Sequence, residues 1–263
     1  MSDYTTITLE RRGAVDWLTL NRPAALNALN PLMVRELHRY FTALEQASLT
    51  RIVVLAAQGP SFCAGLDLKE IGTRIETMDG AAIWAEQRAL SRLILAMRRC
   101  PQPIVCLLQG SASGGGFALA LACDIRIATS DARMNAAFIQ VGLTGCDVGV
   151  SYHLPQMVGS SVAAELMMTG RFLSAERAYT LGLVSEIVTR AQLMAAGERL
   201  TEELLLAAPM ALELTKLGLS TALGVDRLEA AVEIEDRQQA LMANSIEFKA
   251  RIRGFLAKML SRA

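Results

Sequence analysis

Apolar and polar positions alternate with a period of two at the start of the chain. This period extends over residues 5–10 and again over residues 14–20, and Arg11, Arg12 and Gly13 lie between them. A period of two places successive side chains on opposite faces of a strand, and glycine permits a tight turn. The pattern therefore predicts an opening β-hairpin.

Helical and strand patterns then alternate as far as residue 129. Asn30 followed by Pro31 is typical of a helix N-cap with proline at the first helical position. Apolar residues recur after it at helical spacing, at Leu32, Leu37, Tyr40, Phe41 and Leu44. Short apolar runs predict strands at residues 51–57, 104–108 and 124–129, and helical patterns occupy residues 81–99 and 117–122. This order of elements predicts an α/β fold.

Helical patterns dominate after residue 160. They occupy residues 161–169, 174–181, 191–208, 209–222 and 225–245. The sequence contains no internal repeat and no low-complexity linker, which argues against a second independently folding domain. We expect an α/β core over residues 1–200 and a C-terminal helical region over residues 201–263.

The composition narrows the class of protein. Of the 263 residues 52% are hydrophobic, enough to bury a large core. Lys plus Arg and Asp plus Glu number 26 each, so no excess of charge attracts nucleic acid or an anionic membrane. The start of the chain carries Asp3 and Glu10, unlike a signal or transit peptide, and no apolar run approaches the roughly 18 residues of a membrane span. We expect a cytosolic protein that binds neither nucleic acid nor membranes.

Cysteine and histidine give no sign of a metal centre. The five cysteines are odd in number and include no CxxC pair, which argues against a disulfide framework and a structural zinc site, so we expect them to act as small apolar residues. The only histidines, His38 and His153, show neither metal-ligand nor catalytic-triad spacing. We expect both to be structural and no metal to be bound.

A glycine-rich loop, GSASGGG at residues 110–116, follows a predicted strand and precedes a predicted helix. Backbone N–H groups at such a helix N-terminus form a site for an anion or oxyanion. A dinucleotide-binding GxGxxG and a hydrolase GxSxG both fail at Ala112. By itself the loop is also compatible with a tight turn that has no ligand.

Three further motifs accompany GGGF: LNRPAALNAL at residues 20–29, FCAGLDLKE at residues 62–70 and AERAYTLGLVSEIV at residues 175–188. Together they resemble the enoyl-CoA hydratase/isomerase (crotonase) family over nearly the whole chain. The resemblance implies a spiral of ββα turns with a C-terminal helical trimerisation region, in trimers or dimers of trimers. It also implies an acyl-CoA substrate and no separate cofactor, because coenzyme A is part of the substrate.

The resemblance assigns the thioester oxygen to two backbone N–H groups, those of Leu66 and Gly115. Fixed donors suit this task because removing a proton beside a thioester places negative charge on that oxygen. Coenzyme A contacts are implied at Arg22, Ala25, Leu26, Ala64, Asp67, Leu68, Phe255 and Lys258. Asp67 is also open to a catalytic role, although we favour bracing of its loop, and the helix with Phe255 and Lys258 is also compatible with a solvated helix that has an interface phenylalanine.

Both hydratase glutamates are absent. Alignment of GGGF places the first at Ala118, and alignment of ARMNAAFIQVG places the second at Phe138. Neither side chain activates water or donates a proton, which makes ordinary hydration doubtful.

One acid remains in GLTGCDVG, residues 142–149. The segment resembles the loop from which dienoyl-CoA and epoxyphenylacetyl-CoA isomerases present an aspartate, here Asp147. One carboxylate suffices to move a double bond from β,γ to α,β, although Asp147 is also placed to cap a turn before a helix. We expect an enoyl-CoA isomerase. Hydration, thioester hydrolysis, dehalogenation and non-catalytic acyl-CoA binding remain as alternatives.

Overall fold

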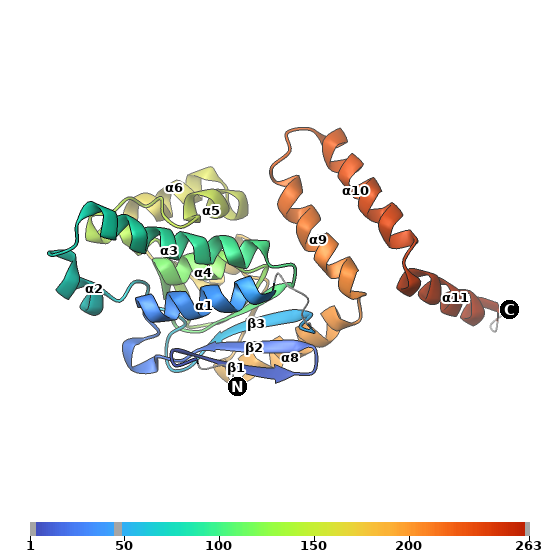
Figure 1. Ribbon diagram of the computed structural model, residues 1–263, viewed down its shortest axis with the longest axis horizontal. Helices are drawn as coiled ribbons and strands as arrows, with labels where there is room; N and C mark the ends of the chain where they lie inside the picture. The colour runs from blue at the N-terminus through green and yellow to red at the C-terminus, as the bar shows by residue number, and fades with distance from the viewer. Residues whose placement is uncertain (1–3, 45–48, 261–263) are drawn as a thin grey trace. The chain divides into compact units, whose positions relative to one another are not determined.

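The computed structural model describes residues 4–44 and 49–260, except the side chains of Lys258 and Leu260. The chain divides into two compact units, Met1–Glu202 and Glu203–Ala263. Figure 1 labels many of the elements of each unit and colours the chain from its N-terminus to its C-terminus. Each unit is described by itself below.

A six-stranded sheet forms the centre of the first unit. Its strands, in spatial order, are β1 (Ile7–Arg12), β2 (Val15–Leu20), β3 (Ile52–Ala57), β4 (Ile104–Leu108), β6 (Ile125–Thr129) and β9 (Glu186–Val188). β1 and β2 form the predicted antiparallel hairpin, with Gly13 at φ +61° in its turn, and all other neighbours are parallel. A second sheet contains β5 (Ser111–Ser113), β7 (Arg133–Asn135) and β8 (Leu173–Ser174).

Helices connect these strands. In chain order they are η1 (Pro23–Ala25), α1 (Pro31–Leu44), α2 (Leu68–Ile75), α3 (Gly80–Arg99), α4 (Gly115–Ala122), η2 (Ala137–Val141), α5 (Val150–Val158), α6 (Ser160–Thr169), α7 (Ala175–Thr180), η3 (Arg190–Gln192) and α8 (Leu193–Leu205). The strand and helix order confirms the predicted α/β fold.

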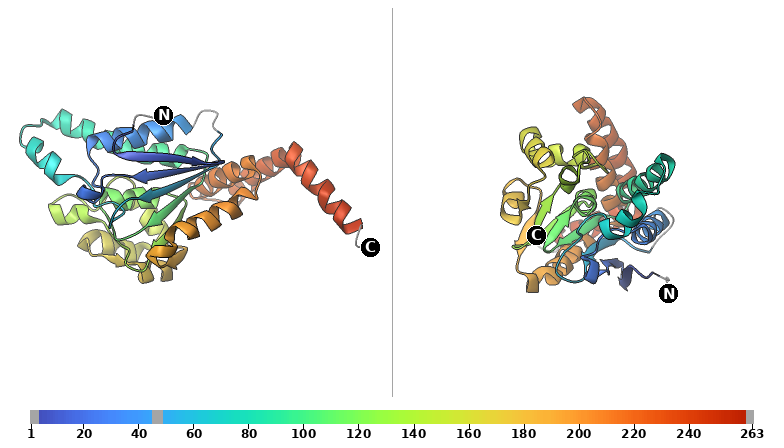
Figure 2. Two further views of the ribbon diagram at one scale, coloured as in Figure 1. Left: turned by 90° about the horizontal axis from the view of Figure 1, so that it is seen from below. Right: turned by 90° about the vertical axis from the view of Figure 1, so that its left-hand side faces the viewer.

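Helices cover both faces of the large sheet, as successive residues of β2 show. Asp16 accepts a hydrogen bond from the Tyr40 hydroxyl of α1 at 3.0 Å. The next residue, Trp17, lies against α8, where a β-carbon at Gly197 would be 3.4 Å from its ring. Since neighbouring side chains of a strand point to opposite faces, α1 and α8 lie on opposite sides of the sheet, and Figure 2 shows this layering. α1 and α3 contact each other.

Local sequence signals account for several helix starts. The Asn30 side chain accepts from the Met33 N–H at 2.9 Å, which confirms the predicted N-cap of α1. Leu32 in the first turn of α1 is 37% exposed, whereas Met33 and Val34 are buried. The four cysteines at 63, 100, 106 and 123 are buried as predicted, but Cys146 is exposed, so the prediction of an apolar role is wrong for that residue.

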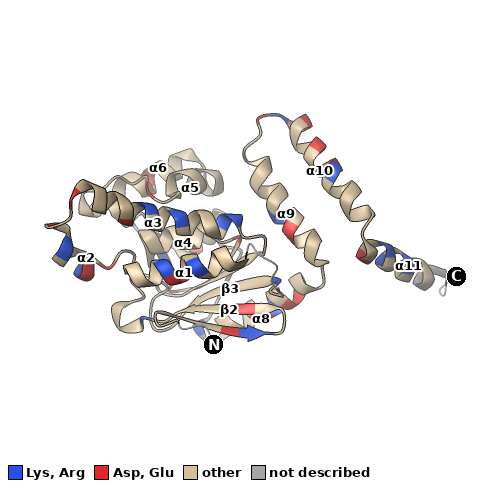
Figure 3. Cartoon of the chain, viewed as in Figure 1, with Lys and Arg blue, Asp and Glu red and all other residues tan. Residues whose placement is uncertain are grey.

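The second unit consists of α9 (Pro209–Ala222), α10 (Leu228–Ala243) and α11 (Ile246–Leu260). α10 contacts both α9 and α11, and the Arg251 guanidinium donates to the Leu206 carbonyl at 2.6 Å. Residues of both charge signs lie on α10 and α11 (Figure 3). Across both units, no single described helix has the length and apolarity to cross a lipid bilayer.

Candidate active site

Three segments that are distant in the sequence meet beside α4. A parallel β-bridge joins Leu29 to Leu66, and another joins Cys63 to Ala112. The hydrogen bonds of the first run from the Leu29 N–H to the Gly65 carbonyl at 2.7 Å and from the Asp67 N–H to the Leu29 carbonyl at 3.0 Å. These bridges fix the loop that carries Leu66 between the segment of Leu29 and the segment of Ala112.

The bridge determines where the Leu66 N–H points. In a parallel pair, one residue uses its own N–H and carbonyl to bond the residues on either side of its partner. Leu29 is that residue here, so the N–H of Leu66 is directed away from Leu29. Among the described residues it donates to no protein acceptor.

Gly115 is the first residue of α4, where backbone donors have no acceptor within the helix. The chain enters this turn through Gly114 at φ 50° and ψ −116°, a conformation that favours glycine. A β-carbon at Gly65 would lie 2.7 Å from the Ser113 carbonyl oxygen and 3.6 Å from the Gly115 nitrogen. Gly65 therefore packs directly against the turn, and it brings the N–H groups of Leu66 and Gly115 into one region.

A buried cation holds the other end of α4. Arg126 is 7% exposed and donates to the carbonyls of Ala120 at 3.2 Å and Cys123 at 2.6 Å. These carbonyls belong to the last turn, where the helix dipole favours positive charge. The helix thus has, at its start, an N–H of Gly115 that donates to no acceptor among the described residues, and at its end a guanidinium.

Asp67 and Arg22 brace the loop of Leu66. The Asp67 side chain caps α2 by accepting from the Glu70 N–H at 3.2 Å, and it pairs with Arg22 at 2.9 Å. The same guanidinium donates to the Ala28 carbonyl. Burial of Asp67 opposes its ionisation, but these hydrogen bonds outweigh burial and lower its pKa. Asp67 and the Ala28 carbonyl therefore hold the Arg22 side chain, which is 21% exposed, beside the loop.

The other implied coenzyme A contacts of the first unit lie around the same loop. Leu26 is at φ 50° directly after η1, which ends at Ala25, and its carbonyl accepts from the Ala64 N–H at 3.0 Å. Leu26 is 43% and Leu68 58% exposed.

The two positions that lack hydratase carboxylates are apolar and buried. Ala118 lies on α4 and is 1% exposed, and Phe138 lies on η2 and is 8% exposed. The Phe138 ring would be 3.4 Å from a β-carbon at Gly114. The turn that carries Gly115 therefore packs against an aromatic ring rather than an acid.

Asp147 lies in the loop between η2 and α5. Its Oδ1 accepts from the Gln87 side chain at 2.5 Å and from the Val148 N–H at 2.8 Å, and among the described residues its Oδ2 accepts no hydrogen bond. Burial raises the pKa of Asp147, while these two hydrogen bonds act in the opposite direction. The side chain does not cap α5, because Gly149 occupies the N-cap position without a side-chain bond.

The other titratable groups of this region are engaged or neutral. Glu70 accepts from Asn30 at 3.0 Å, and Glu86 pairs with Arg74 at 3.0 Å. Burial, reinforced by nearby arginines, lowers the pKa of His153 to about 4, so this imidazole is neutral at neutral pH. No group of three or more metal-ligating side chains lies within the described residues.

The two tail residues belong to the second unit. Phe255 lies on α11 and is 62% exposed. The side chain of Lys258 lies outside the part of the chain that the structure describes.

Two features of the site escaped sequence reasoning. The first is Gln87, a polar residue three and seven positions before Leu90 and Ile94, on the buried stripe of α3. A polar side chain on such a stripe was the available signal. The second is Val148, whose φ of 38° no sequence pattern indicates.

Comparisons of the sequence and of the structure with known proteins both find similarity to enoyl-CoA hydratases, and the sequence is also similar to an acyl-CoA isomerase. The sequence matches the enoyl-CoA hydratase/isomerase family over residues 10–260. It is 37% identical to the probable enoyl-CoA hydratase EchA12 of Mycobacterium tuberculosis, over 85% of this chain and 80% of that one. It is 30% identical to the 1,2-epoxyphenylacetyl-CoA isomerase of Escherichia coli, over 92% and 91% of the two chains. A crystal structure of an enoyl-CoA hydratase from Mycobacterium smegmatis has a TM-score of 0.90 at 31% identity and covers 97% of each chain.

Proposed function

The chain belongs to the enoyl-CoA hydratase/isomerase family and is an enzyme of that family, and from this premise we propose that it moves an acyl-CoA double bond from the β,γ to the α,β position. The observation that carries the proposal is that, of the three family positions considered for an acid or base, only Asp147 carries a carboxylate. The resemblance aligns Ala118 and Phe138 with the glutamates of hydratases, and both positions are buried and apolar. Among the described residues, one carboxylate oxygen of Asp147 has no hydrogen-bond donor.

The thioester oxygen would lie at the free N–H groups of Leu66 and Gly115. When the α-carbon loses its proton, the electron pair of the C–H bond delocalises onto this oxygen. Donors already fixed by the β-bridge and by the start of α4 stabilise the charge without reorganising. The loss of one such donor typically costs about 2.7 to 4 kcal/mol in activation free energy.

Asp147 would carry the proton. Its Oδ2 takes the proton from the α-carbon and forms a carboxylic acid beside a dienolate. The same oxygen then gives the proton to the γ-carbon, and the electrons of the dienolate form the α,β double bond. No water or second acid is consumed, which suits a site in which the turn before Gly115 packs against the Phe138 ring.

Hydration is the second candidate, because the relatives' names include hydratases as well as an isomerase. Thioester hydrolysis, dehalogenation and binding without turnover remain further alternatives. Activity of the full chain on matched 3-enoyl-CoA and 2-enoyl-CoA substrates separates these reactions. We expect isomerisation of the 3-enoyl series and poor hydration of crotonyl-CoA. Fast hydration of crotonyl-CoA would show that another acid reaches the substrate, and the absence of every turnover would favour binding alone.

We further propose a cytosolic homotrimer or dimer of trimers, in which Phe255 and Lys258 contact the coenzyme A of a neighbouring subunit. The apolar surface of α11 supports this, since Phe255 is exposed within its own unit. Sedimentation and coenzyme A affinity of a chain that lacks residues 254–263 test it. We expect weaker affinity on truncation. A monomeric full-length chain at micromolar concentration, with unchanged affinity after truncation, would contradict the assembly.

A further inference from the structure

One face of α3 connects Asp147 to the start of α4. Gln87, Leu90 and Ile94 follow one another at helical spacing and therefore share a face. Gln87 donates to Asp147, and the Leu90 side chain lies 3.8 Å from the β-carbon position of Gly115. Ile94 lies 3.7 Å from that of Gly149. The carboxylate and the Gly115 donor thus lie against adjacent turns of one helix.

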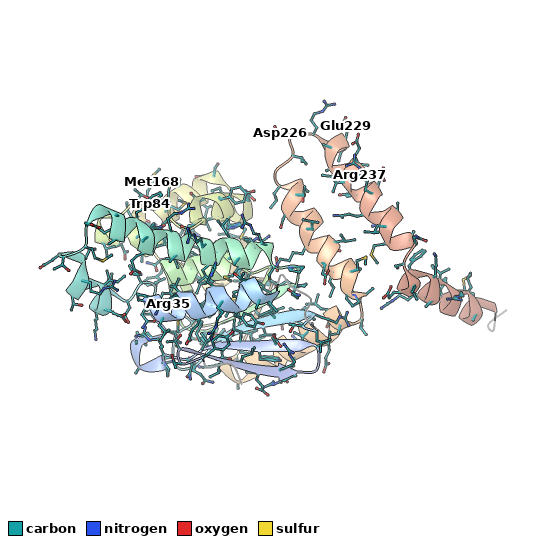
Figure 4. The ribbon with its side chains drawn as sticks, in the orientation of Figure 1. Arg35, Trp84, Met168, Asp226, Glu229 and Arg237 are labelled. Atoms are coloured by element: carbon teal, nitrogen blue, oxygen red, sulfur yellow. The ribbon has the colours of Figure 1, made fainter. Side chains whose placement is uncertain are left out.

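The outward face of α3 has a different character. Trp84, labelled in Figure 4, is 65% exposed. The Arg88 guanidinium lies over its ring, 5.9 Å from the ring centroid. Gln87 therefore lies at the edge between the exposed face of α3 and the face that packs against the site.

The two oxygens of Asp147 are not equivalent. Oδ1 accepts two hydrogen bonds, from the Gln87 Nε2 and from the Val148 N–H, and Oδ2 accepts none from the described residues. Two donors on one oxygen fix the rotation of the carboxylate. Oδ2 is the oxygen left for substrate.

Val148 adds a backbone constraint to this arrangement. Its φ of 38° lies in the left-handed region, which a β-branched residue adopts only under strain. The Val148 side chain is 8% exposed, and packing of this kind holds the residue in that conformation. The Val148 N–H donates to Oδ1 at 2.8 Å, so this constrained residue lies directly beside the carboxylate.

We propose that Gln87 is a positioning residue for Asp147: it binds Oδ1, and with the Val148 N–H it presents Oδ2 to the reacting carbons. This inference rests on the proposed isomerase function and names the group that orients its proton carrier. Gln87 itself touches neither the proton nor the thioester.

The charges around the loop support a local role for this hydrogen bond. On α3, Glu86 pairs with Arg74 and Arg98 with Asp124, and on α5 His153 is neutral. The pKa of Asp147 is set by burial, which raises it, and by hydrogen bonds from Gln87 and Val148, which lower it. Loss of the Gln87 donor should therefore raise this pKa further.

The test replaces Gln87 by Leu or, with a more similar shape, by Met, and uses Arg88→Gln on the outward face as the matched control. At about pH 7 we expect both Gln87 variants to lower kcat about 10-fold to 100-fold with little change in KM, because a loosely held base loses near-attack geometry. The acid limb of kcat/KM should move to higher pH, and Arg88→Gln should match the wild type. A Gln87 variant that folds with unchanged kcat and an unchanged acid limb would overturn the proposal.

Two further measurements keep this result separate from the isomerase assignment. Side-chain carbonyl ¹³C NMR of Asp147 reports its pKa whether or not the enzyme isomerises, and we expect an upward shift in Gln87→Leu. In an Asp147→Asn background, Gln87→Leu should have no additional effect on kcat, because the two residues act as one unit. Full additivity in this background would refute a role through Asp147. A fully active Asp147→Asn enzyme would refute Asp147 as the proton carrier, while an upward NMR shift in Gln87→Leu would still show that Gln87 acts on the Asp147 carboxylate.

Discussion

The side chain of Leu29 occupies the space in which a β-carbon of residue 115 would lie. Its Cδ1 would be 2.9 Å from that carbon, closer than unstrained contacts allow. The backbone of Leu29 forms the β-bridge to Leu66 at the same time. Leu29 therefore contacts both parts of the proposed oxyanion hole.

Gly115→Val should abolish turnover. The added side chain must displace Leu29 or tilt the Gly115 N–H, and loss of one oxyanion donor typically lowers kcat by about 10² to 10³. Steady-state kinetics with a 3-enoyl-CoA, with circular dichroism to establish folding, measure the effect. Gly72→Ala on α2 is the matched control, because its β-carbon meets no atom within 4 Å. A folded Gly115→Val enzyme of near wild-type activity would place the hole elsewhere.

Asp147→Asn should lower isomerisation by about 10² to 10⁴, the range for loss of a positioned acid or base. The amide has nearly the same size and keeps an oxygen for Gln87 and Val148, so affinity for coenzyme A should change little. Rates and product-inhibition constants measured together test both parts. Undiminished isomerisation would point to Glu70 or Glu86 as the proton carrier.

The same substitution should have a pH-dependent effect on stability. Because the pKa of Asp147 is raised above its ordinary value of 3.8, the folded protein binds this proton more tightly than the unfolded chain. That contribution is complete below 3.8 and is lost as the pH rises through the raised value. We expect Asp147→Asn to unfold at an equal or higher temperature than the wild type near neutral pH, with the difference shrinking in acid. A variant that is less stable at neutral pH would show that the ionised carboxylate contributes favourably.

Substitutions of Asp67 should separate bracing from catalysis. Asn is a good N-cap and retains an acceptor for the Glu70 N–H, whereas Ala loses the cap of α2, which typically costs about 1 kcal/mol. Both substitutions lose the ion pair with Arg22. We expect Asp67→Ala to be the less stable variant in thermal unfolding and Asp67→Asn to keep most of the isomerase rate. A loss of about 10² or more in both variants would indicate a catalytic carboxylate instead.

The elements that depend on local sequence patterns could be predicted from the sequence. The hairpin, α1, α3 and α9 have strong periodicity or clear caps, so their existence and nearly their bounds were predictable. α2 combines polar residues with Gly72, and α5 contains Pro155 within the helix, so neither stood out as an apolar helix.

The arrangement of the site depends on contacts between distant residues. Gln87 and Asp147 are 60 positions apart, and only the packing of α3 brings them together. The motif resemblance predicted that Leu66 and Gly115 share one site. The contacts of Leu29 with both residues depend on the folded structure and could not be predicted from the sequence. The strain at Val148 comes from its surroundings, which no propensity of valine encodes.

The guanidinium of Arg126 has an effect beyond closing the last turn of α4. The helix has eight residues and is thus about 12 Å long, so the cation and the Gly115 N–H, at opposite ends of it, are separated by on the order of 12 Å. With an effective dielectric constant of about 20, a unit positive charge at this distance lowers the energy of an anion by about 1.4 kcal/mol. Arginine keeps its charge when buried. An enolate oxygen bound at the proposed oxyanion hole would therefore lie in a long-range positive potential, generated by a residue at the far end of α4.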